Sequence, residues 1–490
     1  MSPVVWQQPQ LILAELARRG VVPHGLVTDS RKVRAGWVFA AYPGERLDGR
    51  RFIAQAVAAG AAAVLCEVAD GWNEPLPSAI VILPVAGLKF MISELADAMF
   101  GHPSQALRVI GVTGTNGKTS CAHWLAQTLA AAGTPAAVMG TLGNGVLPDL
   151  EPADNTTGDA ALLQQQLAQY RAQGVRAVAM EVSSIGLEQR RVEAVRFDTA
   201  LLTNLSRDHL DVHGDMDRYA AAKARLFSWP GLRCAVINAD DAFGATLLRG
   251  GGAQADAVMG YGFGAAEVRG RSLTLSAAGL DMQVDTPWGG VRIVSHMLGR
   301  FNASNLLGVL GVLLAGGMDR EQAAGLLQQL KPPAGRMQTL GGGARPLVVV
   351  DYAHTPDALE KVLTSLRELA PAARLLCVFG CGGERDAGKR PLMGAIVSRL
   401  ADVAVVTSDN PRGEAPERIL ADIRAGMDGR EQVEADRGRA IEIALEQSRP
   451  GDIVLVAGKG HEAYQEIAGV RHPFSDAAVV MHWLEARTWA

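Results

Sequence analysis

The segment Val112–Ser120, VTGTNGKTS, contains the residue types that bind nucleotide phosphates. The strict phosphate-loop pattern is G-x-x-x-x-G-K-[ST]; Gly117, Lys118 and Thr119 match its end, but valine stands at 112 where the first glycine belongs. A glycine occurs instead at Gly114. In such loops the lysine reaches the β- and γ-phosphates and the threonine hydroxyl binds Mg²⁺, so the segment predicts an ATP site. The alternative is a tight turn that carries a solvated lysine.

Acidic and histidine side chains follow in two places. Glu181 ends the apolar run VRAVAME, a position where nucleotide-hydrolysing proteins place a metal-binding acid. A surface carboxylate at a strand end is the alternative. The segment DHLDVHGD, residues 208–215, has His209 and His213 among three aspartates. Oxygen ligands with one imidazole suit Mg²⁺, whereas a simple polar loop would use these histidines for hydrogen bonds.

Rigid elements are needed to position these side chains. Residues 107–112, LRVIGV, predict a buried strand, and residues 118–132 have apolar side chains at helical spacing before Gly133. A strand, a glycine loop and a helix N-terminus together point backbone N–H groups at phosphate. From about residue 341, four further apolar runs end in Gly, Asp, Asn or His. In open parallel sheets ligands bind at those strand ends.

Length and composition limit the class of protein. A chain of 490 residues is too long for one core and predicts about three domains. We place them at residues 1–100, 101–338 and 339–490, with the glycines at 341–343 as a hinge. The net charge of −4 and the lack of a basic tract argue against a nucleic-acid partner. No segment reaches the ~18 consecutive apolar residues that a membrane span needs.

The N-terminal segment and the cysteines indicate a compartment. The first residues lack the basic n-region of a signal peptide. Five cysteines, at positions 66, 121, 234, 377 and 381, are odd in number and scattered, which is typical of a reduced cytoplasmic protein. Cys377 and Cys381 have neither the spacing nor the setting of a zinc site. A redox role for this pair is the alternative to two simple reduced thiols.

Ten segments in order, over about residues 27–465, resemble the Mur ligase family: GVTGTNGKTS, NTTG, EVSS, TNLSRDHLDVHG, YAAAKARLF, GRFNASN, DYAHTPDALE, GERDAGKRP, SDNPRGE and AGKGHE. The family's loop reads G-T-N-G-K-[ST], with its glycine where Gly114 stands, so valine at 112 is not a defect. The resemblance implies an α/β fold of three domains. These are a small α/β N-terminal domain that binds the UDP-sugar, a central P-loop ATPase-like α/β domain, and a C-terminal Rossmann-like α/β domain that binds the amino acid.

The resemblance also implies roles for individual positions. Lys118, Glu181, His209 and Lys223 would be catalytic, with Mg²⁺ on Thr119, Glu181 and His209 and a carbamate on Lys223, which is otherwise an ordinary exposed helical lysine. ATP would contact Gly114, Thr115, Asn116, Gly117, Lys118, Thr119, Ser120, Asn302, Arg336 and Asp351. The UDP-muramoyl dipeptide would contact Thr28, Ser30, Asn155, Thr156, Thr157, Ser183, Gln189 and Arg191. The family often has histidine after EVSS; this chain has Ile185, to which we assign no role.

The segment SDNPRGE resembles the family members that add meso-diaminopimelate. It follows the apolar run ADVAVVT, so we expect it at the end of a strand, where ligands bind. The alternative, with the same sequence pattern, is an Asn-Pro turn that carries a solvated arginine. Arg412 and Asn410 can bind the distal carboxylate of this amino acid, Glu462 its distal ammonium, and Arg385 the other carboxylate. The predicted amino-acid site comprises Arg385, Asp409, Asn410, Pro411, Arg412, Gly458 and Glu462.

The implied reaction joins meso-diaminopimelate to UDP-N-acetylmuramoyl-L-alanyl-D-glutamate in cytoplasmic peptidoglycan precursor synthesis. ATP phosphorylates the substrate carboxylate, and the amine then attacks the acyl phosphate. Small-molecule substrates and a monomer are expected. Three alternative functions remain. One is a folylpolyglutamate-synthetase-like ligase, whose chain would start close to its phosphate loop, and another is a lysine-adding Mur ligase. The third is a P-loop switch or transport ATPase, which would release phosphate without an amino acid.

Overall fold

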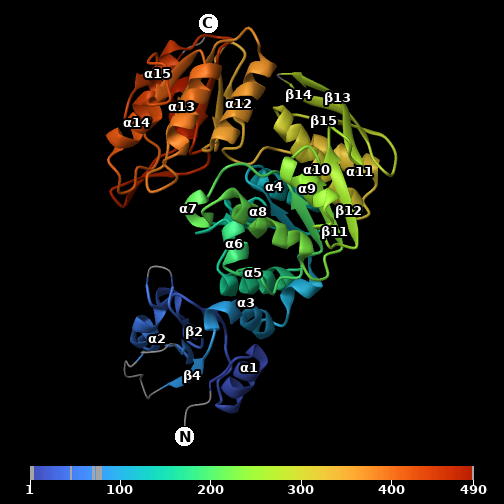
Figure 1. The fold of residues 1–490 in the computed structure, drawn as a ribbon, viewed down its shortest axis with the longest axis vertical. Helices are drawn as coiled ribbons and strands as arrows, with labels where there is room; N and C mark the ends of the chain where they lie inside the picture. Colours follow the sequence, from blue (N-terminus) through green and yellow to red (C-terminus); the bar gives the residue numbers. More distant parts are fainter. Residues whose placement is uncertain (1–4, 45–46, 69–71, 73–79, 277, 488–490) are drawn as a thin grey trace.

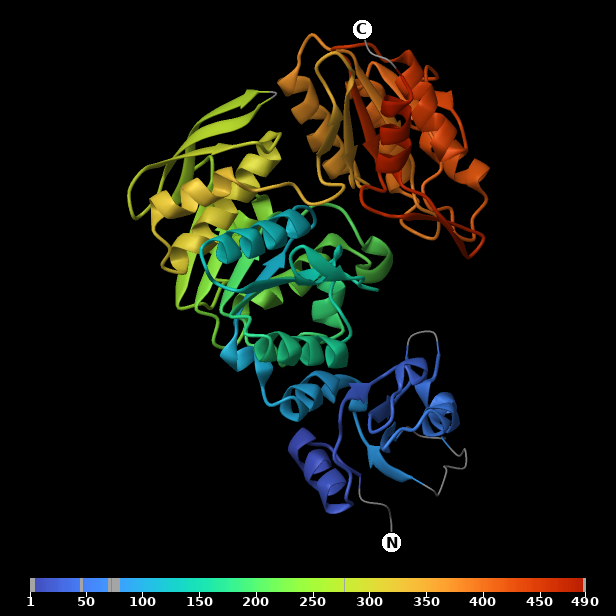
Figure 2. The ribbon, with the colours of Figure 1, turned by 180° about the vertical axis from the view of Figure 1, so that it is seen from behind.

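The structure, a computed structural model, describes residues 5–44, 47–68, 72, 80–276 and 278–487. Three α/β bodies follow one another along the long axis, with the N-terminal body at one end and the C-terminal body at the other (Figure 1). The view from behind shows the same order (Figure 2). Among the described residues, no helix has both the length and the apolar character needed to cross a membrane.

The N-terminal body is a four-stranded parallel sheet in the order β1-β2-β3-β4. Its middle strands are buried on both faces, as expected for parallel strands covered by helices. Two apolar clusters result, one on each side, and one of them includes Ala160 and Ala161 from the central body. The elements are α1 (Pro9–Arg18), β1 (Leu26–Val27), β2 (Val38–Ala41), α2 (Ile53–Ala58), β3 (Ala63–Glu67), β4 (Val81–Val85) and α3 (Leu88–Met99).

The central body is built on an eleven-stranded sheet in the order β15-β14-β13-β12-β11-β10-β5-β9-β6-β7-β8. Its middle strands run parallel, while antiparallel hairpins extend it at both edges. The strands are β5 (Arg108–Thr113), β6 (Ala136–Gly140), β7 (Gly143–Val146), β8 (Asp149–Glu151), β9 (Ala177–Glu181), β10 (Thr199–Leu202), β11 (Cys234–Asn238), β12 (Ala257–Gly262), β13 (Val268–Ser276), β14 (Gly279–Asp285) and β15 (Val291–Ser295).

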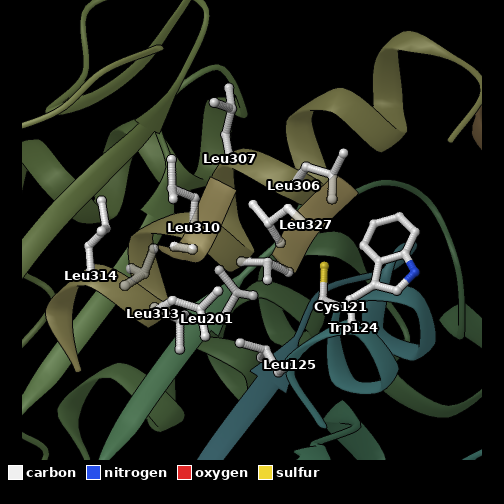
Figure 3. Packing of buried hydrophobic residues seen from close by; sticks show 14 of the residues in the cluster. Cys121, Trp124, Leu125, Leu201, Leu306, Leu307, Leu310, Leu313, Leu314 and Leu327 are labelled. Atoms are coloured by element: carbon white, nitrogen blue, oxygen red, sulfur yellow. The ribbon is translucent and has the colours of Figure 1, made fainter. Parts of the chain in front are cut away.

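Helices cover both faces of this sheet. On one face, leucines of α10 meet Cys121, Trp124 and Leu125 of α4 and Leu327 of α11 (Figure 3). On the other face, α5, α6 and α9 pack with Leu226 and Phe227 against the alternate strand residues. The helices are α4 (Lys118–Ala131), α5 (Ala160–Ala172), α6 (Ser184–Glu188), α7 (Leu210–His213), α8 (Met216–Ala224), α9 (Ala242–Arg249), α10 (Arg300–Ala315) and α11 (Arg320–Gln328).

The C-terminal body has a six-stranded sheet in the order β16-β17-β21-β18-β19-β20, parallel except for β16. Helices α12, α13 and α14 pack on one face and α15 and α16 on the other. The elements are β16 (Gln338–Gly341), β17 (Leu347–Asp351), α12 (Pro356–Leu369), β18 (Leu375–Phe379), α13 (Lys389–Leu400), β19 (Val403–Val406), α14 (Pro416–Arg424), β20 (Gln432–Val433), α15 (Arg437–Gln447), β21 (Ile453–Ala457), the hairpin β22 (Tyr464–Ile467) and β23 (Val470–Pro473), and α16 (Asp476–Glu485).

The predicted hinge at the glycines of residues 341–343 is wrong. β16 pairs antiparallel with β17; Gly341 is the last residue of β16, opposite Leu347, and Gly342 and Gly343 begin the turn of this hairpin inside the C-terminal sheet. All three have positive φ, which glycine adopts without strain. The connection from the central body is instead residues 329–337, which lie between α11 and β16.

Candidate active site

The phosphate-loop segment joins the end of β5 to the start of α4. Gly114 has φ of +145°, and a Cβ there would lie 1.9 Å from the Thr203 hydroxyl oxygen. Gly117 has φ of +85°, and a Cβ there would lie 2.7 Å from Asn305 Oδ1. Val112 is a buried residue inside the strand, before the loop turns. The glycine is therefore required at 114 and not at 112, and the helix N-terminus is left open because Gly117 has no side chain.

Lys118 and Thr119 begin α4 and face the loop. The Lys118 ammonium donates to the carbonyls of Gly114 and Thr115, at 2.9 Å each. Burial lowers the pKa of Lys118. Thr119 Oγ1 donates to Glu181 Oε2 at 3.0 Å and accepts from Arg336 Nη2 at 2.9 Å. The lysine is thus held over the loop by weak carbonyl partners, which a phosphate could replace.

Glu181 is a fully buried carboxylate at the end of β9, so a surface carboxylate is excluded. Besides the Thr119 bond, its oxygens accept hydrogen bonds from the Thr141 N–H at 2.8 Å and the Thr141 hydroxyl at 3.2 Å. Any side chain at Gly140 would collide with it, since a Cβ there would lie 2.2 Å from Glu181 Oε1. Sequence reasoning missed Gly140 and Thr141, which only the neighbouring strand β6 brings to the acid.

His209 and His213 have different surroundings. His209 precedes α7 with φ of +54°, its Nε2 lies 3.4 Å from Asp208 Oδ2, and burial lowers its pKa. His213 is buried; its Nε2 is 2.9 Å from Ser184 Oγ and its Nδ1 3.0 Å from Glu188 Oε2. His209 lines the central cavity, whereas His213 fastens α7 to α6.

Lys223 on α8 is 1% exposed, so the exposed-lysine alternative is excluded. Its Nζ donates to the carbonyl of Gly114 at 2.9 Å, the same oxygen that Lys118 uses. Nζ also lies 4.6 Å from the centroid of the Tyr219 ring. Burial and the charge of Lys118 hold the pKa of Lys223 well below its usual value. This environment favours the neutral amine.

A cavity of about 660 Å³ lies between the phosphate loop and the C-terminal body. Arg336 contacts both sides of this cavity: its Nη2 donates to Thr119 Oγ1, and its guanidinium lies 4.5 Å from the centroid of the Tyr352 ring. Asp351 accepts from the Met337 N–H at 2.7 Å and the Ala353 N–H at 2.8 Å. The cavity brings together the predicted residues Thr115, Asn116, Gly117, Lys118, Thr119, Ser120, Thr156, Glu181, His209, Asn302, Arg336 and Asp351. Asp208, one of the three aspartates noted beside His209, also lines it, and Asn305, Tyr352 and His354 were not predicted.

The donors around Thr119 fit a magnesium ion. The hydroxyl and the Glu181 carboxylate are hard oxygen ligands on one side of the cavity, and His209 lies in its wall. Within the described part of the chain, no three His, Cys, Asp or Glu side chains converge as a metal cage. Mg²⁺ is usually held by one or two carboxylates together with substrate phosphates, so such a cage is not required.

The predicted amino-acid residues gather at the carboxyl ends of β19 and β21. Asn410 Nδ2 donates to Glu462 Oε2 at 2.7 Å, so these two predicted residues touch. Gly458 has φ of +116°, and a Cβ there would lie 2.6 Å from Asp409 Oδ2. Pro411 is buried beside them. Lys459, which lies inside the predicted segment AGKGHE but was not selected, is buried in their midst.

Arg412 and Arg385 are placed differently. Arg412 has φ of +53°; its N–H donates to the Glu466 carbonyl at 3.0 Å, and its carbonyl accepts from Ala468 at 2.7 Å. Its Nη1 donates to the Gly383 carbonyl at 2.7 Å, so a freely solvated arginine is excluded. Arg385 is exposed, and its Nη1 is 3.5 Å from the Glu384 carbonyl. Arg385 is therefore not held against the Asn410–Glu462 pair.

The residues predicted for the nucleotide-sugar dipeptide fall into two groups. Thr157 Oγ1 lies 3.0 Å from Ser183 Oγ, and Arg191 donates to the Thr157 carbonyl at 2.7 Å and to Gln189 Oε1 at 2.6 Å. The second group joins or lies in the N-terminal body. Thr28 Oγ1 donates to Asp159 Oδ2 at 3.1 Å across the two bodies, and Ser30 Oγ donates to Gln55 at 3.1 Å.

The remaining positions of this set differ in their surroundings. Thr156 Oγ1 is 3.0 Å from Thr141 Oγ1, which links it to the Glu181 site. Asn155 is exposed, and Ile185 on α6 is half-buried. The residues predicted to bind the dipeptide thus extend from the N-terminal body to Thr156, which contacts Thr141 beside Glu181.

Three family models match the chain. A model of the Mur ligase middle domain matches residues 112–313, and one described as Mur ligase, glutamate ligase domain matches residues 335–460. A third, described as Mur ligase family, catalytic domain, matches residues 23–99.

Individual proteins give matches of similar extent. A UDP-N-acetylmuramoyl-L-alanyl-D-glutamate--2,6-diaminopimelate ligase of Chromobacterium violaceum is 51% identical over 475 residues, 96% of each chain. A solved structure of an enzyme of that name matches with a TM-score of 0.67 at 39% identity over 95% of each chain. A Mycobacterium tuberculosis folylpolyglutamate synthase complexed with ADP and AMPPCP matches with a TM-score of 0.65 at 19% identity. That match covers 75% of this chain and 92% of the synthase, a likeness of fold alone.

Proposed function

This chain belongs to the Mur ligase family, and on that premise we propose that it joins meso-diaminopimelate to UDP-N-acetylmuramoyl-L-alanyl-D-glutamate with hydrolysis of ATP. The observation that carries the proposal is 51% identity, over 96% of both chains, to a ligase of that name. The open phosphate loop and the paired Asn410 and Glu462 at the far strand ends support it from the chain's own geometry. The product serves peptidoglycan precursor synthesis.

The first step is phosphoryl transfer. A carboxylate oxygen of the glutamate attacks the γ-phosphorus of ATP, the bond to the β-phosphate oxygen breaks, and an acyl phosphate and ADP form. Two anions must approach, so stabilisation of negative charge dominates this step. Lys118 and the open N-terminus of α4 face the place where the phosphates would lie, and the guanidinium of Arg336 lies beside them.

The second step is aminolysis. The ammonium of diaminopimelate gives one proton to solvent, and the free amine attacks the acyl carbon. Phosphate leaves with the electrons of the carbon–oxygen bond and takes up the second proton that the nitrogen loses as the amide forms. No charge needs to be created on the protein, so the main requirement is an amine held in line with the carbonyl. The binding residues lie on the C-terminal body, which faces the cavity with Asp351 and Tyr352.

Mg²⁺ would be held by Thr119, Glu181 and His209, and when bound it would neutralise phosphate charge. Lys223 is proposed to carry a carbamate: its neutral amine attacks CO₂, a C–N bond forms, and the proton goes to solvent. Burial and the neighbouring Lys118 support this because both favour the uncharged, nucleophilic amine. The carbamate would place a negative charge next to the Lys118 ammonium.

At the amino-acid end, the proposal assigns the distal carboxylate to Arg412 and the distal ammonium to Glu462 with Asp409 nearby. Lysine lacks the distal carboxylate and would leave Arg412 without its partner, so strong preference for diaminopimelate is expected. Arg385 would contact the other carboxylate after moving from its exposed position. At the other end, Thr28 and Ser30 would bind near uridine, and Asn155, Thr156, Thr157, Ser183, Gln189 and Arg191 the muramoyl dipeptide.

We further propose that the enzyme acts as a monomer in the cytoplasm on small molecules and not on nucleic acid. The net charge of −4 supports the last point. The division at about residues 100 and 338 is offered as the division into independently folded units, and the separation of the three larger sheets, β1–β4, β5–β15 and β16–β21, supports it.

The deciding experiment measures phosphate release with ATP, Mg²⁺ and UDP-N-acetylmuramoyl-L-alanyl-D-glutamate across a panel of amino acids, with the product mass read alongside. Release that depends on both the dipeptide and meso-diaminopimelate, with a product heavier by one residue, is expected. Release without amino acid would indicate a switch or transport ATPase, and equal use of lysine would indicate the lysine-adding class. A folylpolyglutamate-synthetase-like role is disfavoured by the Mur match over residues 23–99.

A further inference from the structure

Lys459 is a completely buried lysine at the centre of the amino-acid site. It follows β21, and its ammonium donates to Asn410 Oδ1 at 2.9 Å and to Glu462 Oε2 at 2.8 Å. Asp409 Oδ1 lies 4.0 Å from the same nitrogen. One cation therefore contacts three residues proposed to bind diaminopimelate, on two different loops.

The contacts fix the orientation of the Asn410 amide. A lysine ammonium and a backbone N–H can only donate. Asn410 Oδ1 accepts from both Lys459 and the Glu466 N–H, the latter at 2.9 Å. Its amide nitrogen must then point the other way, toward Glu462 Oε2. Without Lys459, the amide would lose one of the two donors that prevent it from turning over.

The same contacts fix Glu462. Its Oε2 receives both side-chain hydrogen bonds that the described residues make to this carboxylate, one from Lys459 and one from Asn410. None of the described residues donates a hydrogen bond to its Oε1, which is therefore available to a ligand. A carboxylate held at one oxygen presents the other in a defined direction, which an ammonium ligand needs for a short, charge-assisted bond.

The β22–β23 hairpin holds the opposite side of the loop. Gln465 Nε2 donates to the Asp409 carbonyl at 2.8 Å, and the backbone of Glu466 contacts both Asn410 and Arg412. Backbone bonds of this kind fix the path of the loop and survive side-chain replacement. The orientation of the side chains that face the ligand depends instead on Lys459.

We propose that Lys459 is a positioning residue for the amino-acid substrate: its buried ammonium orients Asn410 and Glu462 and offsets the charge of Glu462 and Asp409 before the ligand binds. It touches neither the reacting carbonyl nor the phosphate. Its loss should weaken binding of the amino acid and leave phosphoryl transfer intact. The inference rests on the proposed function for the identity of the substrate.

The test compares Lys459→Met with Lys331→Met, a matched change at an exposed lysine outside both sites. Methionine keeps the length of the side chain and removes the donors. For Lys459→Met the KM for meso-diaminopimelate should rise by about 10- to 100-fold, the effect of losing hydrogen bonds to charged groups. The KM for ATP and the dipeptide-dependent exchange of labelled ADP into ATP, which reports acyl phosphate formation, should stay within about twofold of wild type. Lys331→Met should match wild type throughout.

A second variant, Lys459→Gln, guards against a folding defect. Its amide can still donate to Asn410 or Glu462, so its KM for the amino acid should fall between those of wild type and Lys459→Met. An unchanged KM in Lys459→Met, or equal losses of exchange and ligation in both variants, would overturn the positioning role. Failure of the wild-type enzyme to add diaminopimelate would instead refute the proposed function, so the two failures are distinct.

Discussion

Two buried lysines, Lys223 in the central body and Lys459 in the C-terminal body, have opposite surroundings. Lys223 donates to the carbonyl of Gly114 and has the Lys118 ammonium as its charged neighbour on the same oxygen. Lys459 donates to the Glu462 carboxylate and the Asn410 amide and has Asp409 nearby. Both are essentially inaccessible to water, at 1% and 0% exposure.

The difference shows that burial alone does not decide what a lysine does. Beside another cation, burial holds the pKa of Lys223 well below its usual value, so this amine loses its proton more readily than an exposed lysine does. Beside carboxylates, a buried ammonium has charged partners and can serve as a fixed hydrogen-bond donor. The central site therefore favours an uncharged lysine beside Lys118, whereas the C-terminal site pairs its charges, as the proposed binding of a zwitterionic amino acid requires.

The largest effect is expected from Lys118→Ala. Removal of the cation that faces the phosphates should lower kcat by about 10³-fold, since charge stabilisation dominates phosphoryl transfer. The side chain contacts loop carbonyls rather than the apolar core, so the thermal midpoint should change little. Steady-state kinetics check this, and a variant that keeps more than about a tenth of wild-type kcat would show that Lys118 does not bind phosphate.

Lys223→Ala should follow, with kcat lower by between about 10²- and 10³-fold, because the proposed carbamate would be lost. A short carboxylate such as acetate, added at high concentration, should restore part of the activity. The intact mass measured under CO₂ should be higher by ~44 Da, the mass of the CO₂ added to a neutral amine. Bare lysine in fully active enzyme would contradict the proposal.

Arg412→Ala tests the charge-paired site. We expect kcat/KM for meso-diaminopimelate to fall by a factor that corresponds to a loss of about 2–4 kcal/mol in transition-state stabilisation. This is the range for losing a charged partner of a carboxylate in a partly buried site. The loss with L-lysine should be much smaller, because lysine has no distal carboxylate. Arg439→Ala, at an exposed arginine on α15, is the control. Comparable kcat/KM of wild-type enzyme for both amino acids would refute the assignment.

The smallest effect concerns His123, a buried histidine of α4. Burial lowers the pKa of His123 to about 4. The unfolded chain binds a proton below pH ~6.5 and the folded chain does not until pH ~4, so stability falls as pH drops through this window. Between pH 7 and pH 5.5, the free energy of unfolding should fall by about 1 kcal/mol less in His123→Gln than in wild type. The thermal midpoint of the variant should accordingly change less with pH. His296→Gln, at an exposed histidine, should leave the slope unchanged.

Local sequence patterns predicted the supporting elements well. The strand at 107–112, the glycine loop and the helix that stops near Gly133 correspond to β5, the phosphate loop and α4, because apolar period and glycine punctuation are local properties. The α/β fold and its Mur family are confirmed. The hinge was wrong because glycines at positive φ serve a hairpin turn as well as a linker, and only strand pairing tells the two apart.

Other features could not be read along the chain. Thr141 meets Glu181 because β6 and β9 are neighbours in the sheet, and Lys223 meets Gly114 across 109 residues of sequence. Lys459 lies three residues from Glu462, yet its sequence neighbours do not reveal that its ammonium is buried against Asn410. Its position in a functional segment was the available signal.

The sequence by itself determined the family, the phosphate loop and the identity of most polar groups at the strand ends, because these follow from residue type and short-range spacing. The tertiary structure decided which of them are buried, which share a partner and which stay apart, as Arg385 does. The physical reason is that burial and charge pairing depend on atoms from distant segments. Lys118 and Lys223 donate to the same carbonyl oxygen, and Lys459 bridges two loops, only after the sheets have brought those segments together.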